Sequence, residues 1–328
     1  MKIMVTGGAG YIGSHTVKEL LKQGNEVIIF DSLENGYREA IVGGKFIKGD
    51  LADRNRLDAL FKKEKIDSVV HFAAYADVPE SVSNPEKYFM NNISNGLNLL
   101  EAMRKYNVKK IVFSSSAAVY GIPKRVPIQE EDLKKPSNPY GYTKLVFERI
   151  LGYYDHAYGI KSVSLRYFCA AGADPEGQLG EFHKPEHHLI PRVLLAALGK
   201  IDHLDIFGTD YKTRDGTGVR DYIHVTDLAK AHILALRYLD SGGKTERYNL
   251  GSEKGFSVKE IIDTARKVTG MKITAIEKAR RPGDPDVLIA SSKKIKKELG
   301  WNPEYSSIDT IIRTAFNWLK NHPDGYKK

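Results

Sequence analysis

The first half of the chain alternates short, almost entirely apolar runs with longer segments in which apolar residues recur every three or four positions. The runs "KIMVTG", "EVIIFD", "SVVHFA" and "KKIVFSSS" each have the length of one strand. In the first intervening segment, Ile12, Thr16 and Leu20 follow the helical period. Strands that are apolar on both faces and separated by helices predict an α/β protein with a Rossmann-type, doubly wound parallel sheet.

The second half of the chain has a different pattern. After Cys169 the alternation is lost in the glycine-rich and histidine-containing stretch "GADPEGQLGEFHKPEHHLIP". We therefore expect one domain over residues 1–168 and a smaller C-terminal α/β domain that mainly comprises residues 169–328. The segment 220–250 again has the pattern of a strand or turn plus a helix, and we expect it to return to the first domain. Ser257 and Glu260 have the spacing of a capping box that begins another helix.

The composition excludes several classes of protein. No apolar run among the 328 residues approaches the roughly 20 needed to cross a bilayer. The N-terminal "MKIMVTGG" leads directly into a strand, and Cys169 is the only cysteine. We therefore expect a cytoplasmic protein with no secretion signal, disulfide or membrane segment. The net charge is +9, but the lysines are scattered and not interleaved with aromatic residues, so we expect no nucleic-acid partner.

A glycine-rich motif, "TGGAGYIGSH", follows the first predicted strand and leads into a helix. Its Gly7, Gly10 and Gly13 suit a tight turn, a close approach to a pyrophosphate and close packing of helix on strand. A plain strand-to-helix turn is the alternative. However, Asp31 ends the second strand, where a carboxylate binds an adenosine ribose and repels a 2'-phosphate, so we predict a site for NAD. Asp50, which ends the third strand, suits an adenine contact and a turn cap equally well.

The stretch "NPYGYTK" places Tyr140 and Lys144 on one face of a helix. Pro139 also suits the first turn of a helix, so a plain helix start is the alternative. A tyrosine that acts as a base near neutral pH needs its pKa lowered by about three units, or roughly 4 kcal/mol. A lysine charge about 5 Å away supplies roughly 3 kcal/mol at an effective dielectric constant of 20, and a nicotinium charge adds more, so the two together suffice. With a nicotinamide expected nearby, we predict that the pair transfers a proton.

Five motifs, "TGGAGYIGSH", "SSSAAVYG", "NPYGYTK", "VRDYIHVTDLA" and "RRPGD", occur in this order and together resemble the extended short-chain dehydrogenase/reductase family. Within that family the resemblance extends over essentially the whole chain to the UDP-glucose 4-epimerases. It implies reversible hydride transfer between C4 of a UDP-sugar and tightly bound NAD, through a 4-keto sugar. It also implies a homodimer in which the helices near 84–106 and 139–158 pair across a two-fold axis.

The resemblance assigns roles to individual residues. It makes Tyr140 the catalytic base, Lys144 its electrostatic partner and Ser116 the hydroxyl that bridges substrate and tyrosine. The residues implied for NAD binding are Gly7, Gly10, Tyr11, Ile12, Gly13, Asp31, Asn35, Asp50, Leu51, Phe72, Ala73, Ala74, Asn91, Ser114, Tyr140, Lys144 and Tyr167. The residues implied for UDP-sugar binding are Ser116, Tyr140, Phe168, Cys169, His188, Leu189, Arg220, Tyr222, Arg281, Asp284 and Leu288.

Arg220 and Arg281 are implied to hold the diphosphate, and Asp284 the ribose of the UDP group. A planar guanidinium suits this task because it donates two parallel hydrogen bonds. As isolated residues, both arginines also suit a solvated surface. Leu288 stands where the family places a wall residue that decides whether an N-acetyl sugar fits, although a leucine in the strand "DVLIAS" suits the core equally well.

Three sites depart from the family pattern. Ala118 stands where a threonine is frequent, and Cys169 where an asparagine is usual. The stretch from Tyr75 to Asp77 replaces a lysine that some members have, which predicts the loss of one phosphate contact. We expect the cysteine to be a small buried residue and not a reactive thiol. His187 and His188 resemble a substrate-binding loop, and we predict no metal site because no further ligands stand at metal-binding spacing.

Several other activities are known for proteins with this fold. A 4-epimerase of UDP-N-acetylglucosamine or of a UDP-pentose would use the same residues, and a net oxidoreductase would use the same first half-reaction. A nucleotide-sugar dehydratase usually has an Asp-Glu pair where this chain has Ala117 and Ala118, which disfavours dehydration. A non-catalytic NAD-sensing protein would not need Ser116, Tyr140 and Lys144.

Overall fold

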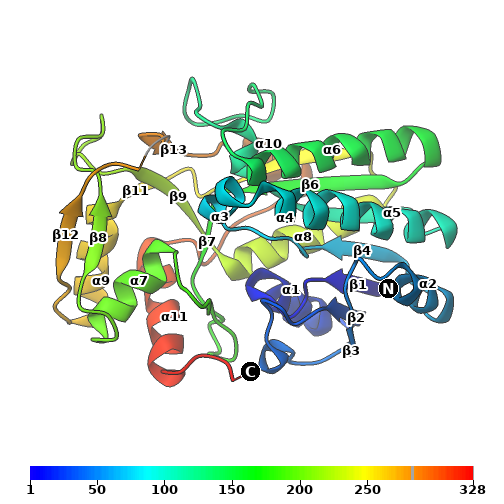
Figure 1. Cartoon of the computed structure of the whole chain (residues 1–328), viewed down its shortest axis with the longest axis horizontal. Helices are drawn as coiled ribbons and strands as arrows, with labels where there is room; N and C mark the ends of the chain where they lie inside the picture. Colours follow the sequence, from blue (N-terminus) through cyan, green and yellow to red (C-terminus); the bar gives the residue numbers. More distant parts are fainter. Residues whose placement is uncertain (282–283, 328) are drawn as a thin grey trace.

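The computed structural model describes residues 1–281 and 284–327. It contains a large sheet with helices on both faces, beside a smaller group of helices and short strands (Figure 1). In spatial order, the large sheet consists of β10 (Glu246–Leu250), β6 (Lys161–Tyr167), β5 (Lys110–Ser116), β4 (Ser68–His71), β1 (Lys2–Thr6), β2 (Glu26–Asp31) and β3 (Lys45–Lys48). All neighbouring strands are parallel. The predicted Rossmann-type fold is therefore confirmed.

The strand order creates the position for a ligand site. From β1 the chain builds outward through β2 and β3, and it then returns to build β4, β5 and β6 on the other side of β1. The connections that leave β1 and β4 therefore run in opposite directions. In open α/β sheets such a reversal leaves a crevice at the carboxyl ends of the strands, where ligands bind.

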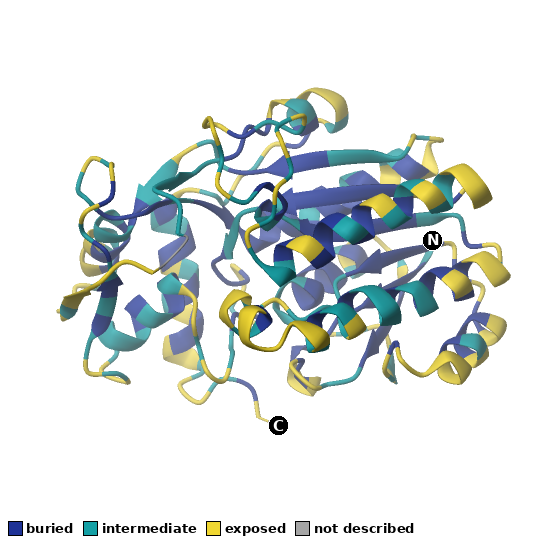
Figure 2. Cartoon of the chain, turned by 45° about the horizontal axis from the view of Figure 1, so that its top comes forward, coloured by how far each residue is buried: buried dark blue, intermediate teal, exposed yellow. Residues whose placement is uncertain are grey.

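Apolar residues on both faces of the sheet explain why the strands are nearly continuous apolar runs. Within β1, Ile3 and Val5 pack in one core while Met4 packs in another, because successive side chains of a strand point to opposite faces. The strands appear as a buried layer between the helices in Figure 2. This two-sided burial is the arrangement that the sequence pattern predicts for a parallel sheet.

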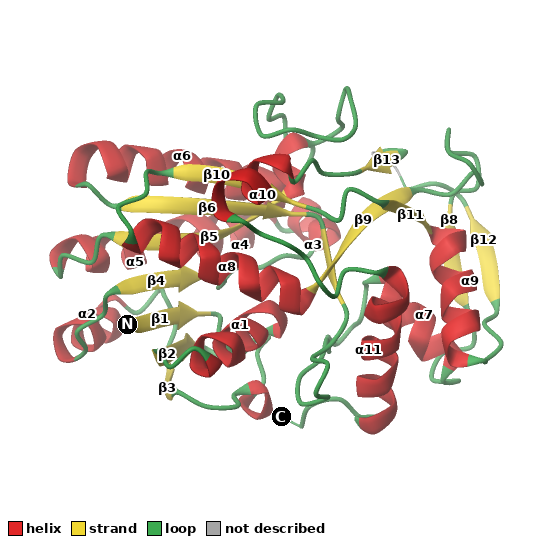
Figure 3. Ribbon diagram, turned by 180° about the vertical axis from the view of Figure 1, so that it is seen from behind, coloured by secondary structure: helices red, strands yellow, loops and turns green. Residues whose placement is uncertain are grey.

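Different helices cover the two faces. The first face is covered by α1 (Tyr11–Lys22), α8 (Val225–Asp240) and α10 (Lys293–Leu299), of which α1 and α8 lie in front of the sheet in Figure 3. The opposite face is covered by α2 (Arg54–Lys63), α5 (Gly96–Lys105) and α6 (Pro139–Tyr158). Shorter segments are η1 (Arg38–Ala40), α3 (Val78–Ser83), α4 (Pro85–Phe89), the π-helical η2 (Met90–Asn95) and η3 (Ala117–Tyr120).

The smaller group of elements is built around a sheet centred on β9 (Val219–His224). Strands β7 (Cys169–Ala171) and β13 (Val287–Leu288) pair with β9 in parallel, and β11 (Gly255–Ser257) pairs with it in antiparallel orientation. A separate parallel pair is formed by β8 (Leu204–Phe207) and β12 (Ala275–Lys278). Helices α7 (Leu189–Ala197), α9 (Val258–Thr269) and α11 (Ile308–Asn321) contribute to one shared core.

Two of the predicted helix starts can be compared with the structure. The capping box of Ser257 and Glu260 is present at the start of α9, as predicted. The helix predicted around 91–106 instead begins with the π-helical turn η2, and α5 starts at Gly96. A Cβ on Gly96 would lie 2.5 Å from the Phe147 ring, so glycine allows α5 to pack closely on α6.

The large sheet extends one strand beyond β6. The run "KSVSLRYF" forms β6, and β10 adds a strand beyond it. This strand ends the segment 220–250 that we expected to return to the first domain. The division into domains at residue 168 stays a prediction. Pro282 and Gly283 of the "RRPGD" motif lie outside the described residues. Within residues 1–281 and 284–327, no helix combines the length and apolarity required to span a bilayer.

Candidate active site

One large cavity of about 830 Å³ opens at the carboxyl ends of the strands of the large sheet. Its wall includes the loops after β1, β2, β4 and β5 on one side, and residues of β9, α7 and β13 on the other. Every residue that we predicted to bind NAD or the UDP-sugar borders this cavity. The structure thus brings together residues from 7 to 288 that are widely separated in the sequence.

The glycine-rich loop lies at one end of the cavity. Gly7 has a φ of +71°, and a Cβ there would lie 2.6 Å from the backbone nitrogen of Ala73. A Cβ on Gly13 would lie 2.1 Å from the carbonyl oxygen of Gly7. Gly10 is the N-cap of α1 and has no side chain to cap the helix, which leaves the N–H groups of the first turn available to an anion. The loop therefore fits a pyrophosphate.

Asp31 ends β2 beside this loop and is buried. Its carboxylate accepts hydrogen bonds from the backbone N–H groups of Ala9 (2.9 Å) and Leu33 (2.8 Å). These bonds occupy one acceptor position on each oxygen and leave others for a ribose hydroxyl. Burial raises the pKa of Asp31, while the two backbone bonds act in the opposite direction. The carboxylate is thus fixed at the position where a dinucleotide places its adenosine ribose.

The second acidic candidate, Asp50, makes the turn contact that we considered as an alternative. Its carboxylate accepts a hydrogen bond from the backbone N–H of Ala52 at 2.8 Å. Asp50 also borders the cavity, so both functions are compatible with its position.

The glycine cradle, the open helix N-terminus and the carboxylate together show that the residues of this chain fit NAD. NADP would place its 2'-phosphate against the negative charge of Asp31. The fit rests on backbone geometry and on one buried carboxylate.

The start of α6 positions the predicted catalytic tyrosine. Asn138 caps the helix by accepting a hydrogen bond from the N–H of Gly141 at 2.8 Å, and Pro139 occupies the first turn. Gly141 is required here, because a Cβ at this position would lie 2.5 Å from the carbonyl oxygen of Ala118. This close contact holds the first turn of α6 against η3, and therefore holds Tyr140 near the end of β5.

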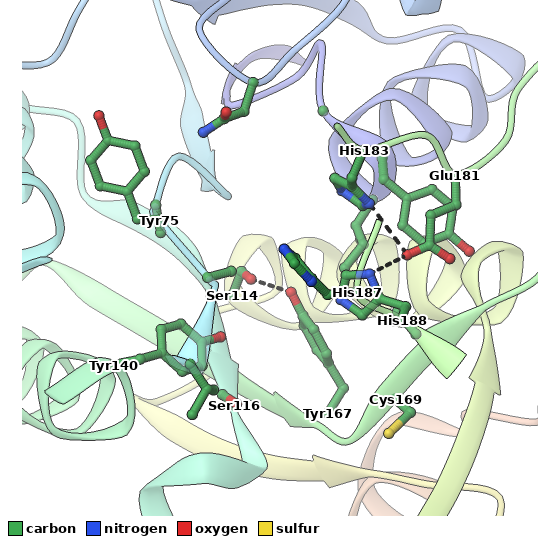
Figure 4. Close-up of a pocket in the computed structure, with 18 of the residues that line it drawn as sticks. Tyr75, Ser114, Ser116, Tyr140, Tyr167, Cys169, Glu181, His183, His187 and His188 are labelled. Atoms are coloured by element: carbon green, nitrogen blue, oxygen red, sulfur yellow. Dashed lines mark hydrogen bonds and ion pairs between the residues drawn. The ribbon is translucent and has the colours of Figure 1, made fainter. Parts of the chain in front are cut away.

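Ser116, Tyr140 and Lys144 all border the same part of the cavity, and Figure 4 shows Ser116 beside the Tyr140 ring. The Ser116 hydroxyl accepts a hydrogen bond from the N–H of Ala118 at 3.1 Å, which orients it at the end of β5. Lys144 is buried, and its ammonium donates a hydrogen bond to the carbonyl oxygen of Ser114 at 2.8 Å. The same ammonium lies 5.8 Å from the centre of the Tyr140 ring.

In the protein without a bound cofactor, burial opposes the pKa shift that we predict for the loaded site, where Lys144 and a nicotinium charge act together. We expected Lys144 to lower the pKa of Tyr140, but burial raises that pKa, and only contact with the Ser116 hydroxyl acts in the opposite direction. Burial also lowers the pKa of Lys144 to about 7, so the lysine carries only part of its charge near neutral pH. The sequence argument considered the attraction between the two groups but not the cost of removing both from water.

The far end of the cavity holds the residues assigned to the UDP group. Arg220 donates hydrogen bonds to the carbonyl oxygens of Val219 (2.9 Å) and Pro285 (3.0 Å), and its other terminal nitrogen lies 3.8 Å from the carboxylate of Asp284. The guanidinium of Arg281 lies 3.9 Å from the centre of the Phe207 ring. These contacts hold the guanidinium groups of both arginines at the cavity wall.

Leu288 and Cys169 also border the cavity. Leu288 packs against a small core that contains Val119 and Tyr120, so it lies both at the wall and against the core. Burial raises the pKa of the Cys169 thiol to about 11, which keeps it protonated and unreactive.

The loop that contains the histidines differs from our prediction. We expected no further ligands around His187 and His188, but Glu181, His183 and Glu186 lie with His188 in one cluster with metal-binding spacing. His187 is outside this cluster and lies 3.6 Å from the carboxylate of Asp77. The stretch "GEFHKPEHH" contained this signal, because its carboxylates alternate with histidines, but the sequence did not show which of its histidines contact the carboxylates.

Other residues at the cavity wall carried no motif that we could have used. They include Glu34, Phe182, Phe207 and Tyr211, together with Tyr75, which we identified only as part of a departure from the family pattern. The Tyr75 hydroxyl donates a hydrogen bond to Glu34 at 2.7 Å, which connects the loops after β2 and β4. These aromatic residues come to the wall through tertiary contacts alone.

Comparison with known proteins identifies the family. The profile of the NAD dependent epimerase/dehydratase family matches residues 3–251. The UDP-glucose 4-epimerase of Lacticaseibacillus casei is 55% identical over 327 residues, which are 99% of each chain. The UDP-glucose 4-epimerase from Brucella ovis in complex with NAD has a TM-score of 0.94 and 47% identity, and the comparison covers 96% of this chain and 97% of that one.

A second solved structure, the UDP-glucose 4-epimerase from Bifidobacterium longum in complex with NAD+ and UDP, has a TM-score of 0.93 and 41% identity, and the comparison covers 99% of this chain and 100% of that one. These similarities confirm the resemblance that the motifs indicated. The chain therefore belongs to the NAD dependent epimerase/dehydratase family.

Proposed function

We propose that this protein is an NAD-dependent UDP-glucose 4-epimerase, which interconverts UDP-glucose and UDP-galactose. The observation that carries the proposal is the convergence of Ser116, Tyr140 and Lys144 on a cavity that also contains the glycine-rich loop and Arg220. Two relatives that are UDP-glucose 4-epimerases each match 99% of this chain. The cavity thus combines a dinucleotide site, a proton-transfer group and a second site with cationic side chains.

NAD, when bound, would supply the acceptor for a hydride from C4 of the sugar, and its reduced form would supply the hydride that returns to the opposite face of that carbon. The task of Tyr140 is to hold the proton of the sugar O4 hydroxyl while the 4-keto sugar exists. Ser116 donates a hydrogen bond to the same oxygen and keeps it near the tyrosine. Lys144, anchored on the carbonyl of Ser114, stabilises the phenolate through its charge. Arg220 and Arg281 hold the diphosphate while the sugar rotates.

The protonation of the pair implies an order of events. Because burial raises the pKa of Tyr140 in the protein alone, the phenol is neutral before the cofactor binds. A positive charge beside the phenol favours the phenolate form and lowers the pKa. Bound NAD would supply a positive charge, so we infer that Tyr140 becomes a base in the loaded enzyme and not through Lys144 alone.

The decisive experiment is incubation of the purified protein with UDP-galactose, followed by a coupled assay for UDP-glucose. We expect turnover without added reductant, since the cofactor is regenerated in each cycle. Transient near-ultraviolet absorbance of reduced nicotinamide should appear when the UDP-sugar is added. Net accumulation of reduced cofactor would instead identify an oxidoreductase, and absence of any turnover would favour the NAD sensor.

The substrate range is part of this proposal. We propose that UDP-glucose and UDP-galactose are the main substrates, with weaker action on UDP-N-acetylglucosamine. Leu288 is intermediate in size between a residue that closes the wall and one that opens it, and it borders the cavity. Direct comparison of kcat/KM for both pairs of sugars tests this ranking.

We also propose that the protein is a homodimer. Several large apolar side chains near the predicted interface helices are exposed in the single chain, among them Met90, Tyr142 and Tyr153. Exposed apolar residues on one face are typical of a protein interface. Light scattering at micromolar concentration should give twice the chain mass of 36.7 kDa, and a monomer mass would contradict the proposal. A cytoplasmic location, consistent with a single cysteine, is tested by fractionation.

A further inference from the structure

The loop between β7 and α7 contains a cluster of four potential metal ligands: Glu181, His183, Glu186 and His188. Their ligand atoms all lie within 4.8 Å of one another. The catalytic steps described above use none of these four side chains for proton or hydride transfer. In Figure 4 the histidines of this loop lie across the cavity from Tyr140 and Ser116.

The distances within the cluster match those between ligands of one small ion. His188 Nδ1 lies 2.9 Å from Glu181 Oε1 and 2.9 Å from Glu186 Oε1. His183 Nδ1 lies 3.3 Å from Glu186 Oε2 and 3.6 Å from Glu181 Oε1. Zinc ligands at roughly 2.0–2.2 Å from the metal are separated by about 3.3–3.6 Å in a tetrahedron. These four distances involve both carboxylate oxygens of Glu186, and ligand atoms taken one per residue lie within 4.8 Å of one another. A bound ion therefore requires the four side chains to move slightly closer together.

The charges of the cluster also favour a cation. The side chains of Glu181 and Glu186 are 6% and 8% exposed. Two carboxylates buried side by side require a positive charge to offset their desolvation. Within residues 1–281 and 284–327, the ion-pair partners of both glutamates are His183 and His188, with no lysine or arginine among them. The cluster is therefore built from ligands and lacks a permanent cation.

We propose that Glu181, His183, Glu186 and His188 bind a divalent transition metal of the zinc class. Two imidazoles and two carboxylates suit Zn²⁺ better than Ca²⁺ or Mg²⁺, which prefer oxygen ligands alone. Four protein ligands in one loop indicate a structural site and not a catalytic one, because a catalytic zinc keeps an open position. The site and its test do not depend on the epimerase activity.

The position of the site gives it a consequence for the cavity wall. His188 is the N-cap residue of α7, and Leu189, the first residue of that helix, borders the cavity. On the other side of the loop, the Tyr11 hydroxyl donates a hydrogen bond to the carbonyl oxygen of Gly172 at 2.6 Å. A metal ion at the cluster thus fixes the segment that connects the glycine-rich loop with the start of α7.

The test uses the full-length protein and needs no substrate. The protein is stripped with a chelator and titrated with Zn²⁺ by calorimetry, and elemental analysis then counts the retained metal. We expect one equivalent per chain. Titration with Co²⁺ should give the intense visible bands of a four-coordinate, tetrahedral cobalt site.

Variants locate the metal. His183→Ala and Glu186→Gln should each weaken Zn²⁺ binding by at least about tenfold, which is the smallest effect expected even for groups that only support a ligand. His187→Ala is the matched control, since this histidine belongs to the same loop but lies outside the cluster, and it should bind zinc like the wild type. Circular dichroism establishes that each variant is folded.

Two results would overturn the proposal. If the stripped wild-type protein binds no stoichiometric Zn²⁺, imidazolium–carboxylate ion pairs alone hold the loop. If His183→Ala and Glu186→Gln bind Zn²⁺ as the wild type does, or if His187→Ala loses it equally, the metal binds elsewhere.

Discussion

The ammonium nitrogen of Lys144 lies 5.8 Å from the centre of the Tyr140 ring, one helical turn along α6, and is anchored on the carbonyl oxygen of Ser114. This anchor keeps the lysine in place whether or not its neighbour is charged. The pKa of Lys144 is lowered to about 7 by burial, and that of Tyr140 is raised by burial. A further positive charge near the Tyr140 hydroxyl is therefore needed to favour its phenolate form.

Tyr140→Phe should lower turnover by about 10²–10⁴-fold, the usual contribution of a positioned acid or base. NAD should remain bound, because the ring and the helix start are retained. The control is Tyr142→Phe, since Tyr142 lies two residues away and its side chain is exposed. The coupled assay and the content of bound cofactor are measured for both variants. Retained activity in Tyr140→Phe with loss in Tyr142→Phe would reverse our assignment along the helix.

Lys144→Met should impair both turnover and cofactor retention. The methionine keeps the apolar contacts of the stem but removes the hydrogen bond to the Ser114 carbonyl and the charge beside Tyr140. Arg149→Met removes a cation from an exposed position of the same helix and should change neither quantity. Gel filtration followed by extraction of bound nucleotide measures retention. A Lys144→Met protein that keeps its NAD fully would restrict the lysine to proton transfer.

Asp31→Asn should weaken NAD binding by roughly tenfold or more, as expected for loss of a hydrogen bond to a charged group. The preference for NAD over NADP should fall at the same time, because the repulsion of a 2'-phosphate is removed. Asp53→Asn is a suitable control, since Asp53 caps α2 and asparagine caps helices equally well. Dissociation constants for both cofactors are compared. An unchanged NAD-to-NADP ratio in Asp31→Asn would contradict the assigned role.

Leu288→Tyr should suppress action on UDP-N-acetylglucosamine more strongly than action on UDP-glucose. A larger side chain at the cavity wall takes the space of the N-acetyl group, and an extra methylene or ring in a pocket changes selectivity by about 10–200-fold. The measurement is the ratio of the two kcat/KM values. A loss of folded protein lowers both values equally and leaves this ratio unchanged. Equal loss of both activities, together with a lower melting temperature, would show that Leu288 mainly supports the core around Val119.

Asp221 should make stability depend on pH. It is fully buried, its carboxylate accepts hydrogen bonds from the N–H groups of Ser252, Glu253 and Ala290, and burial raises its pKa from 3.8 to about 6. Since the folded-state pKa is the higher one, its contribution to the free energy of unfolding is complete below about pH 4 and is lost as the pH rises through about 6. The loss amounts to roughly 3 kcal/mol.

The measurement compares urea denaturation of the wild type and of Asp221→Asn across this pH range. The free energy of unfolding of the wild type should fall relative to that of the variant as the pH rises from 4 to 6. Parallel stability curves would show that Asp221 keeps its ordinary pKa in the folded protein.

The parts of the site that follow local rules could be predicted from the sequence. The glycine-rich turn depends on local backbone geometry, so the need for Gly7 and Gly13 could be recognised from the sequence. Tyr140 and Lys144 are four residues apart, so they lie on the same face of a helix wherever that helix is placed in the fold. The direction in which the pKa of Tyr140 is shifted could not be predicted, because the shift depends on burial of the side chain by elements distant in the sequence. The cluster around Glu181 depends on a loop conformation that no periodic pattern encodes. The strand β10 pairs with residues 83 positions earlier in the chain. The return of segment 220–250 to the first domain was predicted, but the pairing of its last residues with β6 was not visible in the sequence.

The place of β10 at the edge of the large sheet has a consequence for biosynthesis. Its neighbour β6 ends at Tyr167, yet β10 ends at Leu250, so β7, β9 and α8 are translated before the large sheet is complete. While the nascent chain is shorter than this, the edge of β6 has exposed backbone groups that can pair with another chain. A ribosome stalled before residue 246 therefore presents an incomplete, aggregation-prone sheet, which is a target for chaperones.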